Sequence, residues 1–164
     1  MIKDFVSIDL ETTGLLPKED RIIEIAAVRF RDGKEDAVYH SYLNPGREVP
    51  ERITELTGIT PDMVKDAPQF ADVCTEVLDF IGDDVLMAHH ISFDYAFLKR
   101  AVLNCMNSKE AKTKGFEKNG IDTLKIARYF LPDMESRSLG ALCKHYNIAI
   151  DVHKAEEDAR ATAK

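Results

Sequence analysis

Two carboxylates at the end of an apolar run have the spacing of a metal site. Residues 5–8 are followed by Asp9, Leu10 and Glu11. Side chains alternate across a β-strand, so Asp9 and Glu11 would lie on the same face of a strand. Like charges that close repel each other unless a cation lies between them. Carboxylate oxygens suit Mg²⁺ or Mn²⁺, so this strand predicts half of a divalent-cation site.

Two aspartates and a histidine farther along the chain have contexts that could complete such a site. Asp94 follows a short apolar strand in the first turn of an expected helix, and Asp158 lies in the terminal helix, five residues after His153. In an α/β sheet, strand ends and helix starts converge on one crevice, so we expect these residues near Asp9. Taken singly, Asp94 is better explained by the helix dipole and Asp158 by an exposed helix face.

The elements that must position these side chains form a mixed sheet covered by helices. Asp32-Gly33-Lys34 is typical of an antiparallel hairpin. After Pro50, helices alternate with short strands, which favours parallel pairing. The predicted strands are residues 4–10, 21–30, 37–43 and 85–88, with a short one from 121. The predicted helices are residues 51–56, a helix capped by Thr60, and residues 69–81, 92–104, 124–130, 138–146 and 155–164, with Ser92 as the cap of the fourth.

Length and composition fit one compact domain. The chain has 164 residues, 45% of them hydrophobic, which suffices for one sizeable core. No apolar stretch approaches the roughly 20 residues that span a bilayer, and the first residues lead into a strand instead of a signal sequence. We therefore expect a cytoplasmic protein that does not enter a membrane.

The charge of the chain is uneven. A net charge of −7 argues against a protein that coats nucleic acid. Residues 99–118 nevertheless carry six lysines and arginines against two glutamates, a local surplus of +4. A polyanion could bind there, although a solvated lysine-rich loop explains the same composition.

Three ordered motifs resemble a known family. They are Asp9-Leu10-Glu11-Thr12-Thr13-Gly14, His89-His90-Ile91-Ser92-Phe93-Asp94 and His153-Lys154-Ala155-Glu156-Glu157-Asp158. In this order they are similar to the three motifs of the DnaQ-like 3′-5′ exonucleases, in the subgroup with a catalytic histidine and close to the polymerase III epsilon type. Supporting matches at residues 22–28, 56–60, 121–124 and 138–143 extend the resemblance over essentially the whole chain.

The resemblance implies a fold and a two-metal centre. The fold would be an α/β, ribonuclease H-like mixed five-stranded sheet with helices on both faces, as a single exonuclease domain over residues 1–164. Two Mg²⁺ or Mn²⁺ ions would be held by the family's metal-binding carboxylates, matched here by Asp9, Glu11, Asp94 and Asp158. His153 matches the family's general base, a role that suits an imidazole because it is largely neutral at physiological pH.

The resemblance also implies a substrate and its contacts. Nucleoside 5′-monophosphates would be released from the 3′ ends of single-stranded or frayed DNA. The residues at the family's nucleotide-contact positions are Thr12, Leu15, Leu56, Thr57, His89 and Phe93. Each has an ordinary alternative, because lone apolar residues usually belong to a core and threonine hydroxyls often shape turns.

Two features depart from the family pattern. His90 stands where the second motif usually has asparagine, and an imidazole cannot supply both the donor and the acceptor of an amide. The sequence also stops at Lys164, six residues after Asp158, within the expected last helix. We therefore expect a domain cut short in its C-terminal helix or taken from a longer protein.

Three alternative functions remain open at this point. An exoribonuclease that trims RNA ends belongs to the same class, and a magnesium phosphohydrolase would cleave free nucleotides instead of strand ends. A noncatalytic module could keep the fold and use its surface to bind a polymerase or helicase, because fold alone does not determine function.

Overall fold

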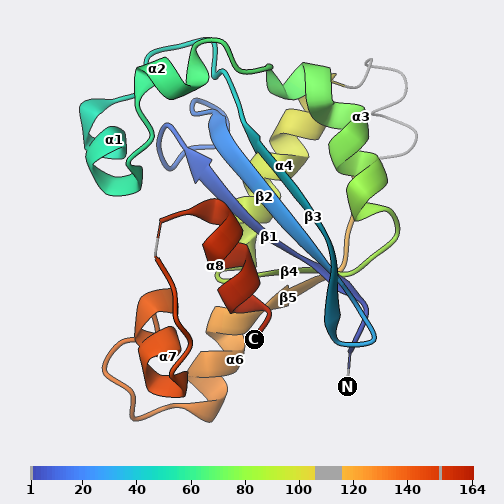
Figure 1. Ribbon diagram of the computed structural model, residues 1–164, viewed down its shortest axis with the longest axis vertical. Helices are drawn as coiled ribbons and strands as arrows, with labels where there is room; N and C mark the ends of the chain where they lie inside the picture. Colours follow the sequence, from blue (N-terminus) through green and yellow to red (C-terminus); the bar gives the residue numbers. More distant parts are fainter. Residues whose placement is uncertain (1, 106–115, 152) are drawn as a thin grey trace.

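The sheet has five strands in the order β3-β2-β1-β4-β5 (Figure 1). The structure is a computed structural model that describes residues 2–105, 116–151 and 153–164, so much of the lysine-rich segment lies outside the described residues. The strands are β1 (Phe5–Thr12), β2 (Ile22–Arg31), β3 (Lys34–Tyr42), β4 (Leu86–Ala88) and β5 (Gly120–Asp122). The predicted number of strands is confirmed.

Strand β1 lies at the centre of the sheet and joins its two halves. It pairs antiparallel with β2 and parallel with β4, and β4 pairs parallel with β5. Strands β2 and β3 form the predicted antiparallel hairpin. Its turn residues Asp32 and Gly33 have φ angles of 50° and 76°, the left-handed conformation that tight hairpins require.

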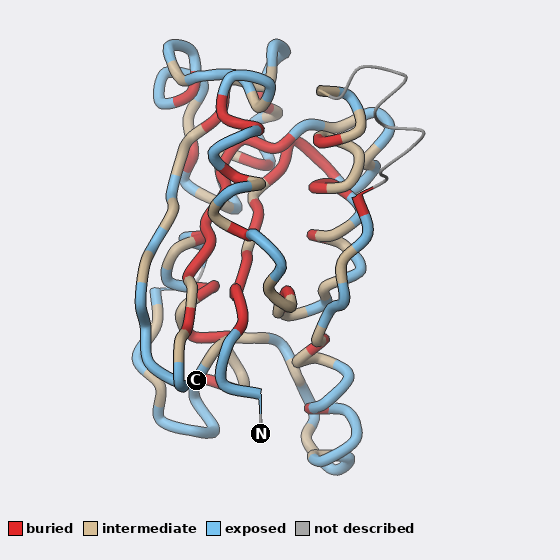
Figure 2. The backbone as a smooth tube through the Cα atoms, turned by 90° about the vertical axis from the view of Figure 1, so that its right-hand side faces the viewer, coloured by how far each residue is buried: buried red, intermediate tan, exposed pale blue. Residues whose placement is uncertain are grey.

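Helices cover both faces of the sheet, as predicted. Their bounds are α1 (Glu51–Thr57), α2 (Pro61–Val64), α3 (Phe70–Ile81), α4 (Ile91–Cys105), α6 (Thr123–Phe130), α7 (Leu139–Tyr146) and α8 (Ala155–Thr162). The larger core lies between the sheet and the pair α3 and α4, and a smaller core lies between the sheet and α8. In Figure 2 the central strands are buried along most of their length.

Alternation along β1 divides its side chains between these two cores. Val6, Ile8 and Leu10 belong to the core beneath α3 and α4. Phe5 belongs to the core beneath α8. Since side chains alternate, Asp9 and Glu11 lie on the same face as Phe5, toward α8. One strand thus anchors the fold with one face and presents carboxylates with the other.

Small residues let α8 lie close to the sheet. Ala155 and Ala159 are fully buried and pack in the same core as Phe5 and Phe30. The two phenylalanine rings stack with their centroids 4.9 Å apart. This packing sets the depth of α8, and hence the height of Asp158 above β1.

The start of α4 differs from the prediction. Helix α4 begins at Ile91, so Ser92 lies inside the first turn and is not its cap. The carbonyl of His90 accepts a hydrogen bond from the Phe93 amide at 2.9 Å, which places the first turn over His90. The φ angle of His90 is 75°, so the chain turns sharply one residue earlier than a serine cap requires.

Helix length also bears on membrane contact. Within the described parts of the chain, no helix combines the length and the apolar character that crossing a bilayer requires.

Enlarging Ala159 should lift α8 from the sheet. We expect Ala159→Leu to lower the free energy of unfolding by about 1–3 kcal/mol, because the extra atoms have no space beside Phe5 and Phe30. Urea denaturation measures this loss. The matched control Ala71→Leu, at an exposed position of α3, should stay within about 0.5 kcal/mol of wild type. Equal stability of the two variants would contradict the packing described for α8.

Candidate active site

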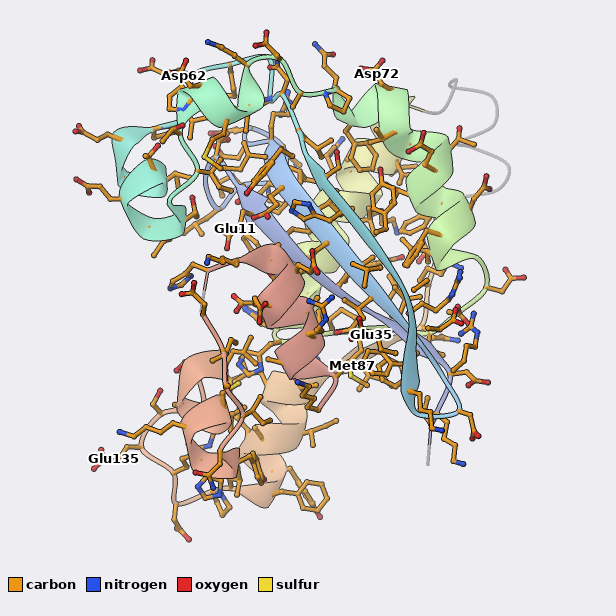
Figure 3. All side chains as sticks on the ribbon, in the orientation of Figure 1. Glu11, Glu35, Asp62, Asp72, Met87 and Glu135 are labelled. Atoms are coloured by element: carbon orange, nitrogen blue, oxygen red, sulfur yellow. The ribbon has the colours of Figure 1, made fainter. Side chains whose placement is uncertain are left out.

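A cavity of about 220 Å³ at the carboxyl end of β1 brings together the five predicted catalytic residues. Figure 3 shows Glu11 at the end of β1, near the start of α8. The cavity is lined by Asp9, Leu10, Glu11, His89, His90, Phe93, Asp94, Leu139, His153 and Asp158. Strand β1, the start of α4 and the start of α8 therefore converge on one point, as the sequence indicated.

Glu11, His153 and Asp158 form the tightest group in this cavity. Each offers one potential metal-binding atom, and these atoms lie within 4.8 Å of one another. Oδ2 of Asp158 accepts a hydrogen bond from the His153 amide at 3.1 Å. Its Oδ1 is buried and has no hydrogen-bond partner among the described residues. A buried oxygen without a partner is expected where an ion or a ligand supplies the missing contact.

Asp94 connects helix α4 to the central strand. Only 4% of this residue is exposed, and its Oδ1 accepts a hydrogen bond from the Leu10 amide at 3.1 Å. The Leu10 side chain packs in the opposite core, so its backbone links the core to the site. Asp94 is therefore held firmly in the first helical turn.

Burial and mutual repulsion raise the pKa values of these carboxyl groups. The pKa of Asp94 rises to about 8 and that of Glu11 to about 7, in both cases mainly because burial disfavours the charged form. The pKa of Asp9 is also raised well above its usual range, by burial first and then by the charges of Asp94 and Asp158. Burial likewise raises the pKa of Asp158. An additional positive charge is needed to keep all four groups ionised.

The residues present fit a divalent cation. No lysine or arginine lines the cavity among the described residues, so its carboxylates have no side-chain cation to neutralise them. Carboxylate oxygens with an imidazole nearby form a donor set that hard divalent cations accept. The unpartnered Oδ1 of Asp158 is one of the oxygens available to such an ion.

His89 uses both ring nitrogens for contacts within the protein. Its Nε2 lies 2.9 Å from the Arg137 carbonyl oxygen, and its Nδ1 lies 3.0 Å from the hydroxyl of Thr123. Because a carbonyl only accepts, Nε2 carries the proton and Nδ1 accepts from the threonine. Burial lowers the pKa of this histidine. Its ring face is what remains for contact with a substrate.

Asp122 holds the backbone at His90, which lines the cavity. Oδ1 of Asp122 accepts hydrogen bonds from the amides of His90, Leu124 and Lys125 at 3.2, 3.0 and 3.2 Å. Asp122 thereby caps α6 and fixes the turn at His90. The left-handed conformation at residue 90 is one that asparagine and histidine both tolerate better than most residues.

Four predicted substrate residues lie outside the cavity. Thr12 is buried, and its hydroxyl donates to the Gly14 carbonyl at 2.6 Å. The Thr57 hydroxyl donates to the Ile53 carbonyl at 2.8 Å. The Thr12 contact is the turn-shaping one that was its alternative explanation, whereas the Thr57 contact lies within helix α1. Two further residues are 77% and 55% exposed, which excludes the core position considered for them; they are Leu15 and Leu56.

The loop after β1 is held by one aspartate. Asp20 accepts hydrogen bonds from the Thr13 hydroxyl at 3.1 Å and the Leu16 amide at 3.0 Å. A Cβ atom on Gly14 would lie 2.4 Å from the Asp20 carboxylate, so a larger residue there would displace the Asp20 side chain. The loop that carries Leu15 is thus tied back to the sheet.

Sequence reasoning missed two residues near the site. Leu139 lines the cavity from the start of α7; its place after Ser138, which caps α7, and the supporting family match at residues 138–143 were the sequence signals for it. Nε2 of His40 lies 2.6 Å from Oε1 of Glu24, the residue that pairs with Glu11 across β1 and β2. This hydrogen bond raises the pKa of His40. Alternation along β3 was the only sequence signal for His40.

A family model and several known proteins match this chain over nearly its whole length. The family model described as an exonuclease, of the RNase T type, matches residues 6–164. A DNA polymerase III of the PolC type from Bacillus subtilis (strain 168) is 40% identical over 160 residues, which are 97% of this chain. The chain spans only 11% of the length of that relative.

Solved structures share the fold. Exonuclease X in complex with 5′-overhanging duplex DNA superimposes with a TM-score of 0.76 at 28% identity, covering 97% of this chain and 86% of that one. Escherichia coli exonuclease I in complex with a dT13 oligonucleotide gives a TM-score of 0.81 at 20% identity, covering 99% and 40%. The predicted ribonuclease H-like fold is confirmed.

The backbone conformation at residue 90 gives a stability prediction. We expect His90→Asn to stay within about 0.5 kcal/mol of wild type, because asparagine adopts a positive φ angle readily. His90→Val should cost about 1–2 kcal/mol, because a Cβ-branched residue is strained there. Urea unfolding of the two variants tests this, and equal losses would show that residue 90 is not held at positive φ in solution.

The raised pKa of Asp94 predicts how metal-free stability depends on pH. In the unfolded chain an aspartate titrates near pH 4, whereas Asp94 has a folded-state pKa of about 8. Between these values the folded state binds more protons, so stability falls as pH rises. In chelator, we expect Asp94→Asn to melt above wild type near pH 8.5 and to lose that advantage near pH 5.

The exposed carboxylate of Asp62 provides the control for this measurement. Asp62→Asn should leave the pH dependence of melting unchanged. A wild-type protein that becomes more stable between about pH 5 and about pH 8.5 would contradict a raised pKa at Asp94.

Proposed function

The chain belongs to the exonuclease family, in its DnaQ-like branch, and on this basis we propose that it removes nucleoside 5′-monophosphates stepwise from the 3′ ends of single-stranded or frayed DNA. The observation that carries the proposal is the convergence of four carboxylates and one exposed histidine in a single cavity. The exonuclease class expected from the motifs is confirmed by the family match.

Asp9, Glu11, Asp94 and Asp158 would hold two Mg²⁺ or Mn²⁺ ions. When bound, such a pair of ions neutralises the scissile phosphate and stabilises the attacking and leaving oxygens. The carboxylates come from three separate elements, β1, α4 and α8, so they can surround a phosphate instead of lining one side of it. The hydrogen bond from Leu10 fixes Asp94 before substrate arrives, which reduces the reorganisation needed during the reaction.

His153 would act as the general base. Its backbone is fixed by the amide contact to Asp158, while the residue itself is exposed at the mouth of the cavity. The imidazole takes a proton from the attacking water as that oxygen bonds to phosphorus. The bond from phosphorus to the 3′ oxygen breaks and that oxygen takes a proton from water, leaving a shortened strand with a 3′ hydroxyl and a free nucleoside 5′-monophosphate.

The terminal nucleotide would be held by apolar and aromatic contacts. Phe93 and the ring face of His89 line the cavity and offer surfaces to a base or sugar. Leu15 and Leu56 project as exposed apolar side chains and would contact the terminal base. Thr12 and Thr57 would act through the backbone that their hydroxyls organise. Such contacts tolerate any base, which suits an enzyme that trims arbitrary ends.

DNA is the favoured substrate because of the structures that share the fold. Exonuclease X was solved with a 5′-overhanging duplex and exonuclease I with dT13. The PolC-type relatives are DNA polymerases, so we propose that this single domain works in the cytoplasm with a polymerase or helicase in replication or repair. Proofreading is the corresponding activity.

The direct test is digestion of a 5′-labelled single-stranded DNA oligonucleotide with Mg²⁺. We expect products that shorten by single nucleotides. Asp9→Asn should lower the rate by at least about 10³-fold, because a metal-binding carboxylate contributes several kcal/mol to the transition state. His153→Gln should lower kcat by about 10²- to 10⁴-fold. The exposed-site control Lys34→Gln should keep wild-type activity.

Each rival function has its own outcome in this assay. Faster digestion of an RNA oligonucleotide of the same sequence would identify an exoribonuclease. Hydrolysis of free nucleotides but not of strands would identify a phosphohydrolase. Activity undiminished by Asp9→Asn, or no activity in a folded wild-type protein, would overturn the catalytic role of this site.

A further inference from the structure

A fifth carboxylate lies beside the proposed cation site and is not one of its four ligands. Glu24 of β2 pairs with Glu11 across the two strands, so both side chains lie on the face of the sheet that α8 covers. Only 4% of Glu24 is exposed. Like charges directly opposite each other in a sheet are destabilising. A buried acid therefore lies where the proposed ligands already repel one another.

The charge of Glu24 acts on two of those ligands. Burial is the largest cause of the raised pKa of Glu11, and the charge of Glu24 is the next largest. The pKa of Asp158 is also raised by burial first, and Glu24 is the charge that raises it most. The Glu24 carboxylate is thus close enough to residues on β1 and on α8 to change their electrostatics.

His40 of β3 is the partner of this fifth carboxylate. Its Nε2 donates to Oε1 of Glu24 at 2.6 Å, because a carboxylate can only accept. This is the only hydrogen bond of the Glu24 side chain among the described residues. The imidazole is itself packed edge-on against the ring of Tyr42, with centroids 5.1 Å apart. Strand β2 lies between β3 and β1, so the contact directs the Glu24 carboxylate away from β1 (Figure 1).

The pair lines a hollow that adjoins the catalytic cavity. The hollow has a volume of about 390 Å³, and His153 lines both it and the cavity. Lys154 also lines the hollow, but its ammonium group is paired with Asp151. Within the described parts of the chain, His40 is therefore the one basic side chain in contact with Glu24.

Stabilisation of the sheet does not by itself account for this pair. Replacement of a buried ion pair by apolar residues of similar volume is often neutral or stabilising, because burial of the charges offsets their attraction. The position of the pair beside Glu11 matters more. Two divalent ions carry four positive charges, which the four carboxylates of the catalytic cavity balance. A fifth ligand would add negative charge and fill a position that phosphate or water needs.

We propose that His40 is a positioning residue of the cation site: its hydrogen bond holds the Glu24 carboxylate toward β3, so that Glu24 does not bind the ions. This inference rests on the proposed function, because it requires that the four carboxylates of the catalytic cavity bind two divalent ions. His40 thereby acts through Glu24 and touches neither the ions nor the substrate.

Removal of the imidazole tests this role. In His40→Ala we expect Mn²⁺ to bind about three- to tenfold more tightly, because Glu24 loses its partner and turns toward the ions. The EPR signal of free Mn²⁺, titrated without DNA, measures this affinity. His40→Val, which suits a strand, should behave in the same way. His40→Gln should stay within about twofold of wild type, since its amide still donates to Glu24.

Two further variants assign the effect to Glu24. His40→Ala combined with Glu24→Gln should bind Mn²⁺ no more tightly than wild type, because no freed carboxylate remains. His145→Ala, which removes an exposed imidazole from α7, should match wild type. In digestion of a single-stranded DNA oligonucleotide with Mg²⁺, we expect His40→Ala to lower kcat about tenfold and His40→Gln to preserve it.

The outcomes separate this inference from the proposed function. Unchanged or weaker Mn²⁺ binding in folded His40→Ala and His40→Val would overturn the role of His40. Tighter binding that persists after Glu24→Gln is added would also overturn it. Neither result affects the proposed function if wild type binds Mn²⁺ and Asp9→Asn does not. Equal Mn²⁺ binding by wild type and Asp9→Asn would instead contradict the cation site itself. Melting temperatures in chelator verify that each variant is folded.

Discussion

Repulsion among buried carboxylates at the end of β1 is the constraint that the rest of the structure must overcome. Asp9, Glu11, Asp94 and Asp158 lie in one small cavity with no lysine or arginine among the described residues that line it. Their raised pKa values record how unfavourable the charged state is. Other interactions must offset this repulsion in the folded state. Burial of apolar side chains in the core on the opposite face of β1 provides that stabilisation.

Backbone amides position these acids more than side chains do. Leu10 donates its amide to Asp94, and His153 donates its amide to Asp158. An amide belongs to the fold itself, so its position is set by strand pairing and helix packing. Side-chain contacts occur next to the site instead, where His40 lies within hydrogen-bond distance of Glu24, the residue that pairs with Glu11 across β1 and β2. Strand pairing and helix packing therefore largely determine the geometry of the site.

The sequence predicted what depends on local spacing and failed where contacts are distant. Alternation placed Asp9 and Glu11 on one face, and Asp32-Gly33 specified the hairpin, because both follow from neighbouring residues. Ser92 was a wrong cap because the preceding turn depends on Asp122, 32 residues away. Leu139 reaches the cavity from the start of α7, which packs against α8, and no local pattern encodes that packing.

The start of α8 has a further consequence. His153 adopts a φ angle of 68° and is tied through its amide to Asp158, so the proposed base and one carboxylate form a single unit at the start of α8. That helix packs on the sheet through alanines, and the salt bridge between Arg160 and Glu35 joins it to β3. Moving α8 would withdraw the base and the carboxylate together. Asp9, Glu11 and Asp94 would stay behind on β1 and α4, so the proposed reaction depends on the contacts that hold α8 to the sheet.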